Sequence, residues 1–305
     1  MSNHPENLDI YDSVGPPTGI FNVKDGDGDD STTVVPISGM QDISTFGIAG
    51  RIWDSSYTLD AYMRRPTDQY TFTPACPIPA EYFLPAKVTT TTSEPASAVA
   101  TTKEKKTPIR ILEIGAGTGY VGIALAKRLD SDCTVILTDL EEVVPLMQKN
   151  VNEQRLSRRP TTSSSASAAT TTIAAAEPLS ETGPYKEPSC AWTLKEITRV
   201  GETKILFGYK ERALWKESPF WEEFGRYFEM EVVRIERHPV KKEGEVGGEE
   251  KGEEKEEEEE GGIEVFGCEG EDRLYVFVAT KRPEDQILKG ADDTLATLMM
   301  MQIGL

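Results

Sequence analysis

The chain has 305 residues and is strongly acidic, with 33 Lys and Arg against 52 Asp and Glu and a formal net charge of −19 at pH 7. This balance argues against a nucleic-acid-binding protein, because phosphate binding needs clustered basic side chains and the sequence has no basic stripe. An acidic surface either suits a basic partner or simply keeps the protein soluble. The length is compatible with one decorated α/β domain.

The cysteines and histidines are too few and too widely spaced to form a structural metal site. The four cysteines include no C-x-x-C pair, and the two histidines are His4 and His238. A structural zinc site needs closely spaced soft ligands, so no metal site is expected. The sequence has no signal-peptide pattern at its start and no run of 18 apolar residues. We therefore expect a cytoplasmic, possibly nuclear protein that does not enter a membrane.

Changes of composition along the chain predict its organisation. Residues 1–42 are polar and predict a disordered tail, followed by one α/β domain over 43–305. Apolar residues from Trp53 to Met63 recur at helical spacing and indicate a folded N-terminal element. Three stretches poor in apolar residues predict low-complexity insertions within the domain, at 87–107, 157–190 and 241–262.

The segment 109–152 has the clearest periodicity. It predicts a strand over Ile109–Ile114, a tight glycine turn, a helix from Tyr120 to Leu129, a strand from Cys133 to Thr138 and a second helix from Glu141 to Asn152. A β-α-β-α order implies a parallel sheet with right-handed crossovers. Further along, we expect a short helix at 193–200, a strand at 204–209, a helix at 218–228 and two more strands at 230–237 and 274–281.

The glycine turn predicts a nucleoside-containing ligand. Glycines at 115, 117 and 119 let the backbone bend sharply next to a ligand, and the following helix offers unpaired N–H groups. Gly117, Gly119 and Gly122 also satisfy the dinucleotide spacing G-x-G-x-x-G, so NAD remains an alternative. The spacing of the glycines does not separate the two ligands.

Two carboxylates beside the turn favour S-adenosylmethionine. Glu113, two positions before the turn, would repel a pyrophosphate but suits the ammonium group of S-adenosylmethionine, which carries no phosphate. Asp139, at the end of the second strand, is placed to accept hydrogen bonds from ribose hydroxyls, a feature that NAD enzymes share. A glycine turn that binds nothing is the remaining alternative.

The run I-L-E-I-G-A-G-T-G-Y-V-G-I-A-L-A, followed by L-T-D-L, resembles the class I, seven-β-strand methyltransferases. It is most similar to the small protein-lysine methyltransferases of the methyltransferase 16 family. The resemblance implies a Rossmann-like, doubly wound, mostly parallel sheet, S-adenosyl-L-methionine as cofactor, and a basic, lysine-bearing protein substrate. Other similar stretches are Gly50–Asp54, Phe207–Arg212, Phe220–Trp221, Tyr275–Ala279 and Asp292–Thr294.

The same resemblance implies cofactor-binding residues. Those expected at the methionine end are Glu113, Gly115, Ala116 and Gly117, and Asp139 is expected to hold the ribose. Two tryptophans complete the implied site. Trp53 is expected near the cofactor, although it could equally anchor an amphipathic helix, and Trp192 is expected beside the adenine.

One departure from the family pattern affects both fold and catalysis. The family carries an acidic-x-x-Tyr motif at the end of a fourth strand, and nothing between Asn152 and Lys204 supplies it. We expect that strand to be lost or replaced, so no catalytic acid or base is assigned. Tyr209 and Arg212 either border the acceptor site or are ordinary strand-end residues. A catalytically silent binding or assembly protein therefore stands beside the protein-lysine N-methyltransferase as an alternative.

Overall fold

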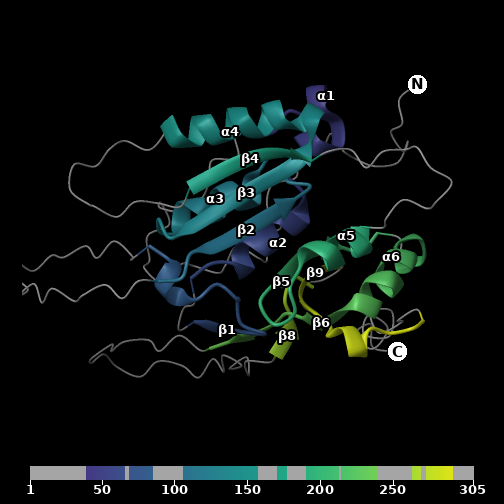
Figure 1. Cartoon of the computed structure of the whole chain (residues 1–305). Helices are drawn as coiled ribbons and strands as arrows, with labels where there is room; N and C mark the ends of the chain where they lie inside the picture. The colour runs from purple at the N-terminus through teal and green to yellow at the C-terminus, as the bar shows by residue number, and fades with distance from the viewer. Residues whose placement is uncertain are drawn as a thin grey trace, which may run out of the picture. The chain divides into compact units, whose positions relative to one another are not determined.

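The computed structural model describes residues 39–65, 69–84, 106–156, 170–176, 190–212, 214–238, 263–268 and 273–290 (Figure 1). They form a mixed α/β structure with one parallel and two antiparallel three-stranded sheets. The chain divides into two compact units. Unit 1 comprises Met1–Arg65 and Ile78–Tyr185, and unit 2 comprises Pro66–Pro77 and Lys186–Leu305. A single domain over 43–305 stays a prediction, and most of the predicted tail and insertions lies outside the described residues.

The sheet of unit 1 is parallel, as the β-α-β pattern predicts. Its strands are β2 (Ile109–Ile114), β3 (Cys133–Leu140) and β4 (Thr170–Ala176), in the order β2-β3-β4. In this register Glu113 lies beside Leu137. Since parallel strands end at the same edge of a sheet, the turn after β2 and the residues after β3 come together there.

Helices of unit 1 bury the apolar residues that their spacing predicts. α3 (Tyr120–Arg128) follows the glycine turn, and most of its side chains are buried. α4 (Val144–Leu156) begins after one 3-10 turn, η4 (Glu141–Val143), and packs on β3 and β4. The N-terminal element is formed by α1 (Ile43–Phe46), the 3-10 turn η2 (Gly47–Gly50) and α2 (Asp54–Tyr62), which packs on α3. Another 3-10 turn, η3 (Ala80–Tyr82), precedes β2.

The predicted low-complexity insertion at 157–190 contains one strand that the sequence pattern does not predict. β4, with the sequence T-T-T-I-A-A-A, pairs over its whole length with β3. The low apolar content of this segment hides the strand, because a parallel ladder is made by backbone groups and β-branched threonines suit it.

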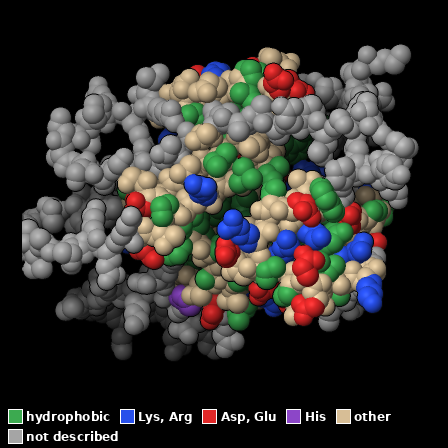
Figure 2. Space-filling model, viewed as in Figure 1, with side chains coloured by type: hydrophobic (Ala, Val, Ile, Leu, Met, Phe, Trp, Pro, Cys, Tyr) green, Lys and Arg blue, Asp and Glu red, His purple; other side chains and the backbone are tan. Residues whose placement is uncertain are grey.

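β4 lies on the side of β3 away from β2, so it does not occupy the place beside β2. Among the described strands, β3 is the only neighbour of β2. Leu112 and Ile114 on β2 are about half exposed, at 48% and 52%. Figure 2 shows apolar side chains gathered over β2 and β3. From the sequence, we expect the family's fourth strand to be lost or replaced. Within the described residues, no strand takes the place beside β2 that β3 leaves open.

Unit 2 has an antiparallel sheet in the order β5-β9-β6, made of β5 (Lys204–Lys210), β9 (Leu274–Lys281) and β6 (Phe228–Val232). Its helices are α5 (Cys190–Ile197) and α6 (Leu214–Tyr227). The core between this sheet and the two helices is aromatic, with Trp221, Phe224 and Phe277 buried.

A second small sheet of unit 2 joins β1 (Tyr70–Thr73), β7 (Arg234–Arg237) and β8 (Ile263–Val265). The single strand expected over 230–237 is thus two strands in two sheets. A last 3-10 turn, η5 (Glu284–Gln286), follows β9. No helix in the described part of the chain is long and apolar enough to cross a membrane.

Candidate functional site

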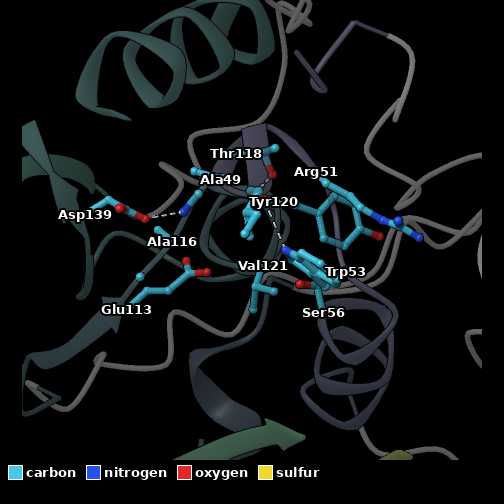
Figure 3. Close-up of a pocket in the computed structure, with 13 residues that line it drawn as sticks. Ala49, Arg51, Trp53, Ser56, Glu113, Ala116, Thr118, Tyr120, Val121 and Asp139 are labelled. Carbon is cyan, nitrogen blue, oxygen red and sulfur yellow. Dashed lines mark hydrogen bonds between the residues drawn. The ribbon is translucent and has the colours of Figure 1, made fainter. Parts of the chain in front are cut away.

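A cavity of about 300 Å³ lies in unit 1 at the carboxyl ends of β2 and β3 (Figure 3). This is the edge of an α/β sheet where ligands usually bind. Three segments build its wall: the N-terminal element, the glycine turn with the start of α3, and the strand ends. The lining residues are Ile48, Ala49, Arg51, Trp53, Ser56, Glu113, Gly115, Ala116, Gly117, Thr118, Tyr120, Val121 and Asp139.

The glycine turn has a backbone that side chains would disturb. Gly115, Gly117 and Gly119 have φ values of 67°, 54° and 75°, in the left-handed region that favours glycine. A Cβ on Gly117 would also come within 2.8 Å of the carbonyl oxygen of Ala49. The turn is held to β3 by the Ala116 N–H, which donates to the Thr138 carbonyl at 3.0 Å. Its backbone is therefore fixed along the cavity.

Glu113 lies at the floor of the cavity, where α3 meets the sheet. Its carboxylate accepts a hydrogen bond from the Gly122 N–H at 2.8 Å, and a Cβ on Gly122 would lie 2.5 Å from that oxygen. Burial raises the pKa of Glu113 from 4.5 to about 7; the Gly122 N–H opposes this rise and the Asp139 charge adds to it. A cation entering the cavity would favour the ionised carboxylate.

Asp139 follows the apolar part of β3 and reaches back to the turn. One carboxylate oxygen accepts from the Gly117 N–H at 2.7 Å, and the other accepts from the Leu140 N–H at 2.8 Å. A carboxylate oxygen has more than one acceptor site, so both oxygens can still receive hydroxyl groups. The carboxylate is thus oriented before any ligand arrives.

Trp53 lines the cavity immediately before α2. Its indole N–H donates to the Ile48 carbonyl at 3.2 Å, and the Arg51 guanidinium lies 5.1 Å from the centre of its ring. Figure 3 shows Trp53 and Arg51 across the cavity from Glu113 and Asp139. Trp53 thus both lines the cavity and stands at the start of α2, and its contact with a cofactor stays a prediction.

The remaining candidates lie in unit 2. Trp192 is on α5, is 44% exposed and is not among the residues that line the cavity, so its role beside an adenine also stays a prediction. The Tyr209 hydroxyl donates to the Glu217 carboxylate, and its ring packs edge-on against Trp221. Burial and the Glu217 hydrogen bond raise the pKa of Tyr209. The Arg212 side chain is exposed.

Several lining residues are absent from the sequence-based predictions. Thr118, Tyr120 and Val121 adjoin the glycine motif, and their position next to it is the signal that could have found them. Ala49 and Arg51 reach the cavity through folding of the N-terminal element, and the signal that could have found Arg51 is its place in the family-like stretch Gly50–Asp54. No cluster of His, Cys, Asp and Glu suited to a metal ion occurs in the described ranges.

Comparison with known families agrees with this geometry. The model of the lysine methyltransferase family matches residues 35–169, which include all the segments that line the cavity. The match supports assignment of the chain to the class I S-adenosylmethionine-dependent methyltransferases of this family. Comparison with curated proteins gives no match.

Proposed function

We propose, with the lysine methyltransferase match over residues 35–169 as the premise, that the chain is an S-adenosylmethionine-dependent protein-lysine N-methyltransferase. The observation that carries the proposal is the pair of carboxylates, Glu113 and Asp139, at the two sides of the glycine turn in a cavity of about 300 Å³. The proposed architecture is the Rossmann-like, doubly wound sheet of this class.

In the proposed complex each part of the cavity meets one part of the cofactor. Glu113 faces the positively charged methionine end, where the ionised carboxylate is favoured. The backbone of Gly115, Ala116 and Gly117 lines the same end. Asp139 accepts hydrogen bonds from the ribose hydroxyls. Trp53 closes the opposite wall, and Trp192 is proposed beside the adenine.

S-adenosylmethionine supplies a methyl group activated by its sulfonium, so the protein's contribution is position and electrostatics. The acceptor lysine must react as the neutral amine, and a dry site lowers the pKa of a lysine. The lysine ammonium releases one proton to solvent before transfer, and the methylated nitrogen then takes over the positive charge of the sulfonium, so the step requires no assigned catalytic base. The acidic chain, with a net charge of −19, suits a basic protein substrate in the cytoplasm or nucleus.

A catalytically silent binding or assembly protein is the second candidate. It is favoured by the absence of an acidic-x-x-Tyr motif between 152 and 204 and by the place beside β2, which no described strand fills. Such a protein would keep the cavity and bind cofactor without transferring a methyl group.

Calorimetric titration with S-adenosylmethionine and S-adenosylhomocysteine tests the cofactor. We expect micromolar binding that Asp139→Ala abolishes and Asp132→Ala preserves, because Asp132 is an exposed carboxylate at the opposite end of β3. A cooperatively melting chain that binds neither compound would refute the proposal. Preferential binding of NADH would instead revive a dinucleotide site.

Transfer of a labelled methyl group to basic proteins then separates the two candidates. Methylation of a protein lysine that Gly117→Arg removes supports the enzyme, because the arginine side chain would clash with the Ala49 carbonyl and block the turn. Cofactor binding without transfer to any protein would support the silent alternative.

A further inference from the structure

Asn150 on α4 is a fully buried polar side chain that lies outside the lining of the cavity. Its amide nitrogen donates two hydrogen bonds, to the Met40 carbonyl at 3.0 Å and to the Thr118 carbonyl at 2.8 Å. Thr118 belongs to the glycine turn, and Met40 precedes the N-terminal element. One amide therefore joins both segments to α4.

Met40 is connected to the cavity wall by a compact loop, residues 41–52. The Asp42 N–H donates to the Gly50 carbonyl at 3.0 Å, and the Ile52 N–H donates to the Gln41 side chain at 2.9 Å. A Cβ on Gly50 would lie 2.1 Å from the Asp42 carbonyl oxygen, so the two ends of this loop are in close contact.

The loop in turn rests on the glycine turn. The Ala49 carbonyl oxygen lies where a Cβ of Gly117 would come within 2.8 Å, so any shift of the loop changes the space over Gly117. Ile48, Ala49 and Arg51, which line the cavity, all belong to this loop or adjoin it. The position of Met40 thus bears on the width of the cavity.

The Asn150 amide has the hydrogen-bonding groups needed to join the Met40 and Thr118 carbonyls. Both partners are carbonyl oxygens, which only a group with two donor hydrogens can join, and a carboxylate at the same place would repel both. The other atom, Oδ1, is buried and has no hydrogen-bond partner within the described residues. The described contacts of this side chain are therefore the two hydrogen bonds that its amide nitrogen donates.

We propose that Asn150 is a positioning residue that sets the cofactor cavity by holding the N-terminal element against the glycine turn. The cofactor part of this inference rests on the proposed function. The positional part concerns only the chain's own segments.

The test compares Asn150→Asp with Asn152→Asp, the same change at an exposed position on the same helix. Asn150→Ala is the second variant, since it removes the donors without adding a charge. Titration with S-adenosylhomocysteine is done at 15 °C on variants whose circular dichroism spectrum matches that of the wild type. We expect Kd to rise about tenfold in both Asn150 variants, from the loss of two hydrogen bonds, and to change less than twofold in Asn152→Asp.

Hydrogen exchange without ligand supplies a readout that general destabilisation would not give. We expect faster exchange in peptides covering 39–53 and 115–120 of both Asn150 variants, with unchanged exchange in β3. Unchanged exchange in the two segments, or equal acceleration in β3, overturns the positional role. An unaltered Kd overturns the link to the cofactor. If the wild type does not bind S-adenosylhomocysteine, the proposed function fails, and the exchange result alone decides the positional role.

Discussion

Glu113→Gln isolates the effect of one buried carboxylate on stability. Burial raises the pKa of Glu113 from 4.5 to about 7, a difference of about 2.5 units or about 3 kcal/mol. In this range the folded state holds a proton that the unfolded state has lost. The free energy of unfolding therefore falls as pH rises from 4.5 to 7 and is level above it. Glutamine keeps an acceptor for the Gly122 N–H but cannot ionise.

Urea denaturation of wild type and variant at a series of pH values measures this effect. We expect the variant to gain about 2.5 kcal/mol relative to the wild type between pH 5 and pH 8. Taking the difference cancels the titrating groups that do not interact with Glu113. Glu153→Gln, at an exposed position on α4, is the control and should run parallel to the wild type. A difference between wild type and Glu113→Gln that stays constant within about 0.5 kcal/mol over this range would refute the buried-carboxylate reasoning.

Three further predictions concern cofactor affinity, the glycine turn and the buried ion pair between Asp60 and Arg128. S-adenosylmethionine is a cation and should bind more tightly as pH rises from 6 to 8, because it favours the ionised form of Glu113. Calorimetry in buffers of different ionisation enthalpy should detect the proton that Glu113 releases on binding. An affinity that does not change with pH would contradict this prediction. Gly117→Ala should abolish binding and lower stability by about 1–3 kcal/mol, since its φ is 54° and its Cβ would meet the Ala49 carbonyl; an unaltered melt and Kd would contradict this. Asp60→Asn should cost about 3 kcal/mol in thermal unfolding, because it leaves the buried Arg128 guanidinium without its ion pair; a loss below about 1 kcal/mol would mean the pair is not buried in solution.

The segment from β2 to α4 could be predicted from sequence because its signals are local. Alternating and helical spacing of apolar residues marks β2, α3, β3 and α4, and the glycines mark the turn that the structure places in the left-handed region. Boundaries shift by a few residues, as at α4, where the first turn is 3-10. Glu113 and Asp139 reach the cavity because both end neighbouring parallel strands, a consequence of topology that the β-α-β order already implies.

Features that depend on distant segments were not predictable in this way. β4 has no apolar pattern, and its pairing with β3 exists only once the sheet is assembled. The strand predicted over 230–237 divides between two sheets because its halves pair with different strands, β9 and β1.

The sequence by itself determined the glycine turn, its two carboxylates and the parallel strand pair that carries them, because these follow from residue type and spacing within about thirty positions. The tertiary structure alone decided what lies opposite the turn. Ala49 rests on Gly117, and Asn150 holds both Met40 and Thr118, although Met40 is 110 residues away in sequence. Such contacts form only when the buried faces of the helices and the sheet pack together, so no local pattern records them.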